Sequence, residues 1–250
     1  MRSRDPGATS RPRPHDPVAP GRYIRRMPLS QAAWARIVPF ALFMSLLALR
    51  GTLPEENAWG LDPRWIYALN LVVVGGALAW LWRAYGEFAR QNRPTAGEAG
   101  LSVVVGLVVF GLWISLDAPW MRLGDATAPF VPMTAAGTPD WPLIAVRWIG
   151  AALVVPVMEE LFWRSFLMRW IASPRFESVD PRAAGLRAIV LSTFVFMLAH
   201  TLWLAAIVAG AAYAWLYVRT GKLWTAVIAH AVTNGVLGIW VVYSGRWEFW

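Results

Sequence analysis

The sequence of 250 residues contains no cysteine and only three histidines. The absence of cysteine excludes disulfides, thiolate metal sites and peptidases with a cysteine nucleophile. The motifs HExxH and GxSxG and a glycine-rich phosphate loop are missing as well. The chain therefore lacks the signatures of zincin metalloproteases, of nucleophile-elbow hydrolases and of P-loop enzymes.

Charged residues are also scarce, at 15% of the chain against 57% hydrophobic residues. A soluble domain of this size cannot easily bury so much apolar surface. Several apolar runs approach the roughly 20 residues that cross a bilayer core of about 30 Å. The 17 tryptophans fit the same environment, because their rings favour the membrane interface. The composition predicts a membrane protein in contact with lipid.

Acidic residues are fewer than basic ones, and the formal net charge is +8. A nucleic-acid-binding domain would need a soluble basic face, and none remains once the apolar runs are assigned to the membrane. Most basic residues lie in short polar stretches between these runs, where the positive-inside rule expects cytoplasmic loops. We therefore expect no nucleic-acid partner.

Seven apolar runs predict an all-α fold, a polytopic bundle of about seven transmembrane spans. Basic connections alternate with acidic or neutral ones, which places the N-terminus in the cytoplasm. No polar turn separates the fifth and sixth runs, so residues 186–218 form either one long bent helix or a buried hairpin. The runs cover residues 33–49, 65–82, 101–116, 142–171, 186–201, 202–218 and 223–243.

Composition divides the chain into three regions. Residues 1–28 are rich in arginine and proline and nearly free of apolar residues, which predicts a disordered basic cytoplasmic tail. Residues 29–141 hold the first three spans, and Arg36 is expected to snorkel at the start of the first. Residues 142–250 hold the other four spans, and we expect them to form the catalytic core.

Three ionisable residues interrupt the fourth run, in the string VPVMEELFWRSF. Such groups cost about 2.5 to 3.5 kcal/mol each on insertion, so they are functional candidates. Glu160 and Arg164 are four residues apart, share a helix face and can pair. Glu159 is rotated from Glu160 by about 100° and stays free to act as a general base. The simpler interpretation is a charged cluster that only holds helices together.

Histidines lie in two later runs, at His200 and His230. A single buried histidine is more often a satisfied core residue, but two beside two glutamates favour chemistry. Asn234 follows His230 by four residues, so the two side chains share a helix face. At about 1.5 Å per residue, Glu159, His200 and Asn234 lie roughly 18, 21 and 17 Å from the cytoplasmic ends of their spans. His230 lies one turn shallower. We therefore expect these four side chains to lie in one polar layer within the membrane.

These groups can activate water and stabilise an oxyanion. A glutamate can accept a proton from water, and a histidine can share that task or bind a metal ion. The amide of Asn234 and a protonated histidine can donate hydrogen bonds to a developing oxyanion.

The motifs closely resemble those of the CPBP (ABI, or CAAX prenyl endopeptidase) family of intramembrane proteases, which carry EExxxR, FxxxH and HxxxN/D on successive transmembrane helices. Here they read EELFWR from Glu159, FMLAH from Phe196 and HAVTN from His230. The resemblance covers about residues 142–243. It implies that Glu159 and His200 activate water, that His230 and Asn234 form the oxyanion hole, and that Glu160 and Arg164 support the site.

The resemblance leaves the cofactor open between a metal-free glutamate mechanism and a divalent metal such as zinc. The metal ligands would be Glu159, His200 and His230. A third strong ligand type is missing, which favours the metal-free mechanism.

The strings VPVMEELFWRSFLMRW and GRWEFW, together with Trp203, resemble the CAAX-protease-related proteins found with exosortase and PEP-CTERM sorting systems. This finer likeness implies the inner membrane of a bacterium, a protein or peptide substrate, and an exosortase-system partner. The chain cannot itself be the sorting transpeptidase, because exosortases use a cysteine.

Two other functions remain open from the sequence. The first is a non-catalytic scaffold or immunity protein that retains the protease fold and uses its polar layer for helix packing. The second is a transporter or proton relay, which intramembrane glutamate and histidine would suit. The sequence shows no inverted repeat to support a transporter.

Overall fold

The computed structural model describes residues 29–53, 60, 62–124 and 130–250. The predicted tail, residues 1–28, lies outside this part of the chain. The described residues contain no named strand, and seven helical regions follow the seven predicted spans in order. They are α1 (Gln31–Thr52), α2 (Ile66–Trp80), α3 (Ala96–Ser115), a continuous helix Trp141–Ala172 labelled α4 to α6, α7 (Leu186–Leu198), α8 (Trp203–Thr220) and α9 (Leu223–Ser244).

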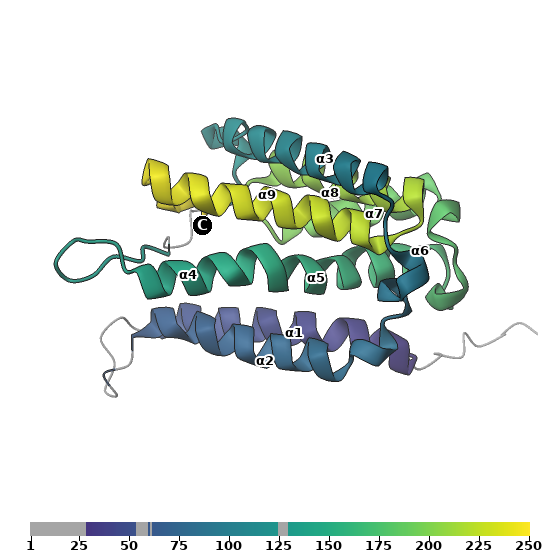
Figure 1. Ribbon diagram of the computed structural model, residues 1–250, viewed down its shortest axis with the longest axis horizontal. Helices are drawn as coiled ribbons and strands as arrows, with labels where there is room; N and C mark the ends of the chain where they lie inside the picture. The colour runs from purple at the N-terminus through teal and green to yellow at the C-terminus, as the bar shows by residue number, and fades with distance from the viewer. Residues whose placement is uncertain (1–28, 54–59, 61, 125–129) are drawn as a thin grey trace, which may run out of the picture.

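The long helices lie side by side with their axes roughly aligned, so the molecule is a helix bundle (Figure 1). The helix α4 to α6 runs between the α1–α2 pair and α9, and α3 covers α9 from the other side (Figure 1). By length and hydropathy, four helices can cross a membrane: α1, α3, the continuous helix α4 to α6, and α9. Helix α7 is a shorter apolar helix. The predicted all-α membrane bundle is confirmed.

The continuous helix contains two π-helical segments, Gly150–Val154 and Leu161–Met168, on either side of α5 (Val155–Glu160). Pro156 explains the first. Proline has no N–H and its ring crowds the carbonyl four residues earlier, so a widened turn before it relieves the clash. The amide N–H of Val155 accordingly donates to Gly150 O, five residues back. Because π turns occur often at functional sites, they mark the segment that carries Glu159 and Glu160.

A turn interrupts the helix between α7 and α8, so residues 186–218 form two helices and not one bent helix. Helix α7 ends at Leu198, and α8 begins at Trp203. The intervening turn pairs with the segment before α4: Leu123 N–H donates to Thr201 O at 2.7 Å, and Trp203 Nε1 donates to Trp120 O at 3.1 Å. His200 therefore lies in this turn, two residues beyond the end of α7, and not on the helix that the sequence predicts over residues 186–201.

A close approach of α3 and α9 ties the N-terminal region to the core. A Cβ added at Gly106 would lie 2.5 Å from Ala229 O, so only glycine permits this spacing. The hydroxyl of Thr233 donates to Gly106 O at 2.9 Å across the same contact. Helix α3 thereby packs against the helix that carries His230 and Asn234.

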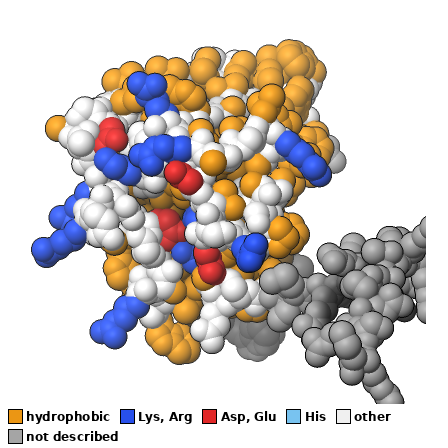
Figure 2. All heavy atoms as spheres, turned by 90° about the vertical axis from the view of Figure 1, so that its right-hand side faces the viewer, with side chains coloured by type: hydrophobic (Ala, Val, Ile, Leu, Met, Phe, Trp, Pro, Cys, Tyr) orange, Lys and Arg blue, Asp and Glu red, His pale blue; other side chains and the backbone are white. Residues whose placement is uncertain are grey.

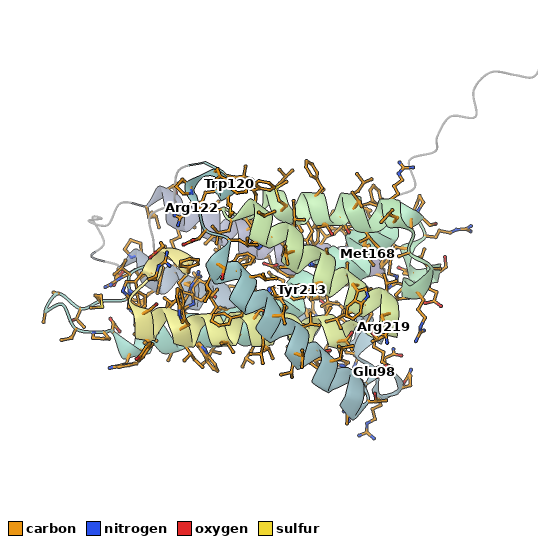
Figure 3. The ribbon with its side chains drawn as sticks, turned by 90° about the horizontal axis from the view of Figure 1, so that it is seen from above. Glu98, Trp120, Arg122, Met168, Tyr213 and Arg219 are labelled. Carbon is orange, nitrogen blue, oxygen red and sulfur yellow. The ribbon has the colours of Figure 1, made fainter. Side chains whose placement is uncertain are left out.

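Lysine and arginine side chains gather at one end of the bundle, where α1 begins and α8 ends (Figure 2). Arg219 and Glu98 lie at this end, and Trp120 and Arg122 lie at the opposite end (Figure 3). The basic residues at this end are Arg83, Arg90, Arg93, Arg175, Arg182, Arg187, Arg219 and Lys222. They all belong to the connections that the sequence predicts to be cytoplasmic.

Arg36 does not snorkel, because its side chain is 5% exposed and fully engaged within the bundle. Its Nη2 lies 2.7 Å from Glu87 Oε2, and its Nε donates to Ser165 Oγ at 2.9 Å. Arg169 Nη1 lies 3.4 Å from Glu87 Oε1. Burial raises the pKa of Glu87. The charge and hydrogen bonds of Arg36 and the hydrogen bond from Ser165 together lower it by more, so the pKa lies below its usual range. We call Arg36, Glu87, Ser165 and Arg169 the Arg36 cluster.

Candidate active site

A cavity of about 280 Å³ lies inside the bundle, and the four predicted catalytic side chains all line it. Glu159 comes from α5, His200 from the turn after α7, and His230 and Asn234 from α9. Phe196, on the last turn of α7, lines the same cavity. Three segments that are far apart in the sequence thus meet around one space, and we call Glu159, His200, His230 and Asn234 the cavity cluster.

Within the cavity cluster, the Glu159 carboxylate has an oxygen that no described protein group holds. Its Oε2 is shielded from solvent and has no hydrogen-bond partner in the part of the chain that the structure describes. The adjacent Glu160 points elsewhere, since consecutive residues on α5 differ in direction by about 100°. Glu159 lines the cavity, and a carboxylate that no protein donor holds is available to a water molecule or a substrate.

Glu160 is fully buried and joins two elements of the site. Its Oε2 lies 3.2 Å from Arg164 Nε, as the sequence predicts. Its Oε1 lies 2.8 Å from His230 Nδ1, a contact that the sequence does not reveal. The carboxylate accepts the Nδ1 proton, so the Nε2 atom of His230 is left for the cavity. Glu160 therefore sets the orientation of His230.

Arg164 holds the surrounding elements together. Its Nη2 donates to Gly210 O on α8 at 3.2 Å, and its guanidinium carbon lies 4.5 Å from the centre of the Phe196 ring. The Tyr213 ring lies 5.5 Å from the same carbon and stacks on His230 at 4.9 Å. Tyr213 lies in the middle of the bundle (Figure 3) and donates from its hydroxyl to Thr233 Oγ1 at 2.8 Å. The pair Glu160–Arg164 thus connects α5 with α7, α8 and α9.

His200 is fixed by the backbone of the helix that precedes it. Its Nδ1 lies 2.8 Å from Phe196 O. Because a carbonyl oxygen can only accept, Nδ1 carries the proton, and Nε2 is the free base of the neutral ring. The ring also packs against Phe196 at 4.3 Å and against Trp113 of α3 at 5.8 Å. The imidazole is therefore held in one tautomer and one orientation.

Asn234 is placed by the first π turn. Its Nδ2 donates to Ala151 O at 2.9 Å. In π geometry the residue that would donate to Ala151 O is Pro156, which has no N–H, so this carbonyl is free to accept. The amide nitrogen carries two hydrogens, and one remains for another acceptor. Because Pro156 leaves Ala151 O without a backbone donor, this carbonyl can accept the hydrogen bond that orients Asn234.

The first three helices also contribute to the cavity wall, which the sequence assigned to residues 142–250 alone. Phe43 of α1, Tyr67 of α2 and Trp113 of α3 line the cavity. Arg147 of α4 lines it too, and sequence reasoning missed this residue. The signal was present, since an arginine inside a predicted span is a functional candidate on the same grounds as Glu159.

The donor set does not fit a metal ion. Among the described residues, no three histidine, cysteine, aspartate or glutamate side chains are grouped closely enough to hold one. Glu159, His200 and His230 share the cavity without forming such a group; the Nδ1 atom of each histidine bonds the protein, and its Nε2 atom stays available.

Residues 141–236 match the family model described as type II CAAX prenyl endopeptidase, Rce1-like. The matched segment includes the whole cavity cluster and leaves out α1, α2 and α3. No curated protein and no solved structure gives a significant match. The family match supports the CPBP family that the motifs resemble and points to a CAAX-type intramembrane endopeptidase. Together with the apolar helices, it indicates a multi-pass membrane protein.

Proposed function

We propose that the protein hydrolyses a peptide bond inside the membrane with a water molecule that Glu159 activates. The observation that carries this proposal is the shielded, unpartnered oxygen of Glu159 in the same cavity as His200, His230 and Asn234. Every other buried carboxylate described above has a cationic partner. A free carboxylate costs energy in an apolar bundle, and catalysis is the role that accounts for this cost.

The first step is proton transfer from water to Glu159. His200, with its Nδ1 proton held by Phe196 O, offers Nε2 as a second acceptor for the same water. The resulting hydroxide attacks the carbonyl carbon of the substrate and forms a tetrahedral oxyanion. Glu159 then returns its proton to the leaving amine nitrogen, which breaks the C–N bond and restores the carboxylate.

His230 and Asn234 are the proposed donors to the oxyanion. The second amide hydrogen of Asn234 is free, and a protonated His230 has a donor at Nε2 while Nδ1 bonds Glu160. Because both side chains are held by other groups before the substrate binds, they stabilise the oxyanion without reorganisation.

Cleavage by the purified full chain in liposomes tests the proposal. A quenched fluorescent peptide library serves as substrate, and the Glu159→Gln variant should lose cleavage while it keeps the elution profile and melting temperature of the wild type. Glu98→Gln is the matched control, since Glu98 lies on a membrane helix outside the cavity and pairs with Lys222 at 2.7 Å. Unchanged cleavage by Glu159→Gln would support a scaffold or a transporter instead.

We further propose that the basic end of the bundle faces the cytoplasm, with the N-terminus on that side. The support is the gathering of arginine and lysine at this end (Figure 2) and the positive-inside rule. Because the chain has no cysteine, single cysteines report orientation cleanly. In spheroplasts, an impermeant maleimide should label Thr138→Cys and spare Ser178→Cys. The reverse labelling would invert the orientation.

We also propose that the substrates are proteins of a bacterial sorting system. The support is the resemblance of the strings around Glu159 and at the end of the chain to proteins found with exosortases. Membrane proteomes of cells with the wild type and with Glu159→Gln should differ in the termini of sorted proteins. A difference confined to unrelated proteins would contradict this assignment.

A further inference from the structure

The chain turns back on itself after α9. Gly245 has a φ of +71°, a left-handed conformation that favours glycine, and its N–H donates to Val241 O. A short 3-10 helix, Trp247–Phe249, follows. The end marked C lies between α9 and α4 (Figure 1). Residues 245–250 therefore fold back along α9, and we call them the fold-back segment.

The fold-back segment reaches the cavity that holds Glu159. Phe249 and Trp250 both line this cavity. A Cβ added at Gly238 would lie 3.4 Å from Cζ2 of Trp250, so the indole packs against α9 at this residue. Gly238 lies one helical turn beyond Asn234, about 6 Å along the helix. Because an extended peptide advances about 3.3 Å per residue, a polypeptide that runs past the site toward this end of the bundle would meet the indole.

Polar contacts fasten the fold-back segment to the rest of the bundle at one point. Arg246 Nη2 lies 2.7 Å from Asp117 Oδ2, in the connection after α3, and Arg246 Nε lies 2.8 Å from Glu248 Oε1 within the segment. In the described part of the chain, the backbone N–H groups of residues 247–250 donate only within the segment. The side chains of Arg246 and Asp117 are 41% and 26% exposed, and such ion pairs contribute little to stability. The segment is therefore weakly fastened.

The turn between α7 and α8 contacts the same connection, but its backbone fastens it. This turn also reaches the cavity, through His200. Leu123 N–H donates to Thr201 O at 2.7 Å, and Trp203 Nε1 donates to Trp120 O at 3.1 Å. Among the described residues, no backbone hydrogen bond joins the fold-back segment to a different helix or turn beyond α9. Of these two segments, only the fold-back segment can move away without breaking backbone pairing with another element.

The position of Trp250 leaves a polar group unsatisfied. Its Nε1 is shielded from solvent and has no hydrogen-bond partner in the part of the chain that the structure describes. A buried N–H without an acceptor destabilises this arrangement, and an indole that moves out to water regains an acceptor. The ring packs edge-on against Phe130 at 6.4 Å and stacks on Trp247 at 5.8 Å, but Trp247 belongs to the segment itself. Few contacts thus hold the segment closed.

We propose that the fold-back segment is a lid over the active-site cavity, hinged at Gly245 and latched by the ion pair of Arg246 with Asp117. The closed lid shields the cavity. The open lid admits a polypeptide that continues past the site toward this end of the bundle. Gly245 suits a hinge because glycine adopts a wide range of backbone angles. The inference rests on the proposed function, since it concerns access to that same cavity.

The lid is tested first without catalysis, by the distances between two spin labels in liposomes. Because the chain has no cysteine, Glu248→Cys on the lid and Val72→Cys on the exposed face of α2 are the only labelled sites. The labelled protein should give one main distance. Adding Arg246→Ala should raise the population of other distances about threefold, as expected for the loss of an exposed ion pair. An unchanged distribution would overturn the proposal.

Arg122→Ala is the matched control for this measurement. Arg122 Nη2 lies 3.8 Å from the same Asp117 Oδ2, but Arg122 belongs to the connection after α3 and not to the lid. The variant removes a positive charge at the same end of the bundle and should leave the distances unchanged. A change as large as that caused by Arg246→Ala would assign the effect to the charge of this end and overturn the latch.

A reversible cross-link then tests access to the cavity. Asp117→Cys and Arg246→Cys are joined by a short bis-methanethiosulfonate, and cleavage of quenched fluorescent peptides of about 20 apolar residues is followed in liposomes. The cross-link should lower cleavage about tenfold or more, and dithiothreitol should restore it. Before cross-linking, the double variant should cleave at least as fast as the wild type. Undiminished cleavage by the locked protein, or loss of cleavage before locking, would overturn the proposal.

A cross-link at the other end of the bundle is the control. Glu98 and Lys222 form an ion pair of 2.7 Å between α3 and the residue before α9. Locking Glu98→Cys to Lys222→Cys with the same reagent should leave cleavage nearly unchanged. Equal inhibition by the two cross-links would show that any tie across the bundle blocks the enzyme, and it would overturn the lid.

Failure of the proposed function is recognisable separately. Spin-label distances that respond to Arg246→Ala, together with a wild type that cleaves no peptide, would retain the lid and refute the peptidase. Cleavage that continues with the lid cross-linked would retain the peptidase and refute the lid.

Discussion

Two clusters of charged side chains lie along the helix α4 to α6, and they differ in whether their charges are satisfied. In the Arg36 cluster, Glu87 contacts two arginines and accepts a hydrogen bond from Ser165. In the cavity cluster, Glu159 has a shielded oxygen without a partner. A network in which every polar group has a partner can only hold helices together. A network with an unpartnered group can bind water or substrate. The comparison separates structural charge from functional charge in one apolar protein.

The largest expected effect on activity comes from a change in the cavity cluster. Glu159→Gln should lower kcat by about two to four orders of magnitude, because the amide cannot accept the proton of water. The folded state should be unaffected, since the side chain has few contacts to lose. Peptide cleavage and thermal unfolding in detergent are measured on the same sample. A large drop in melting temperature would place Glu159 with the structural charges.

Arg36→Met should produce the opposite pattern. It leaves Glu87 buried with only the more distant Arg169, and breaking a buried pair costs about 3 to 5 kcal/mol. The free energy of unfolding in detergent should fall, while kcat of the folded fraction stays near the wild type. Arg219→Met, a change of an exposed arginine, is the control. Equal stability of both variants would contradict a structural role for the Arg36 cluster.

Asn234→Ala should lower kcat about 100-fold, the usual cost of removing one oxyanion donor. KM should change little, because the donor acts mainly in the transition state. The loss of its bond to Ala151 O leaves a part-buried carbonyl unpaired, so a small loss of stability accompanies it. If KM rises and kcat does not fall, Asn234 binds substrate and does not stabilise the oxyanion.

The smallest effect is expected from Tyr213→Phe. The change removes one buried hydrogen bond to Thr233 and should cost about 1 kcal/mol of stability. The ring that stacks on His230 remains, so kcat should change less than threefold. A strong loss of activity would show that the hydroxyl helps to position His230. Unfolding and cleavage are again measured together.

Local patterns explain how much of the site the sequence could predict. Glu160 and Arg164 pair because four residues make one helical turn, and His230 and Asn234 share a face for the same reason. The seven helical regions follow from long apolar runs, because a membrane-spanning α-helix satisfies all its backbone hydrogen bonds within the segment. These interactions are within one helix, so no knowledge of packing is needed.

The structure corrects the sequence where contacts are between helices. The position of His200 in a turn depends on pairing of that turn with residues 120–123. Arg36 is buried because Glu87 and Ser165, which are distant in sequence, lie beside it. Neither partner could be recognised from a run of hydropathy, which reports only the average environment of a segment.

The sequence by itself determined the membrane environment, the order of the helices and the residue types that the chemistry requires. Only the tertiary structure decided which carboxylate is free, since this depends on the contact of Glu160 with His230 as well as with Arg164. It also decided that α1, α2 and α3 close the cavity and that Arg147 faces the cavity. The helical period determines in which direction each side chain of a helix points. Only the packing of the helices determines which residues of other helices it meets.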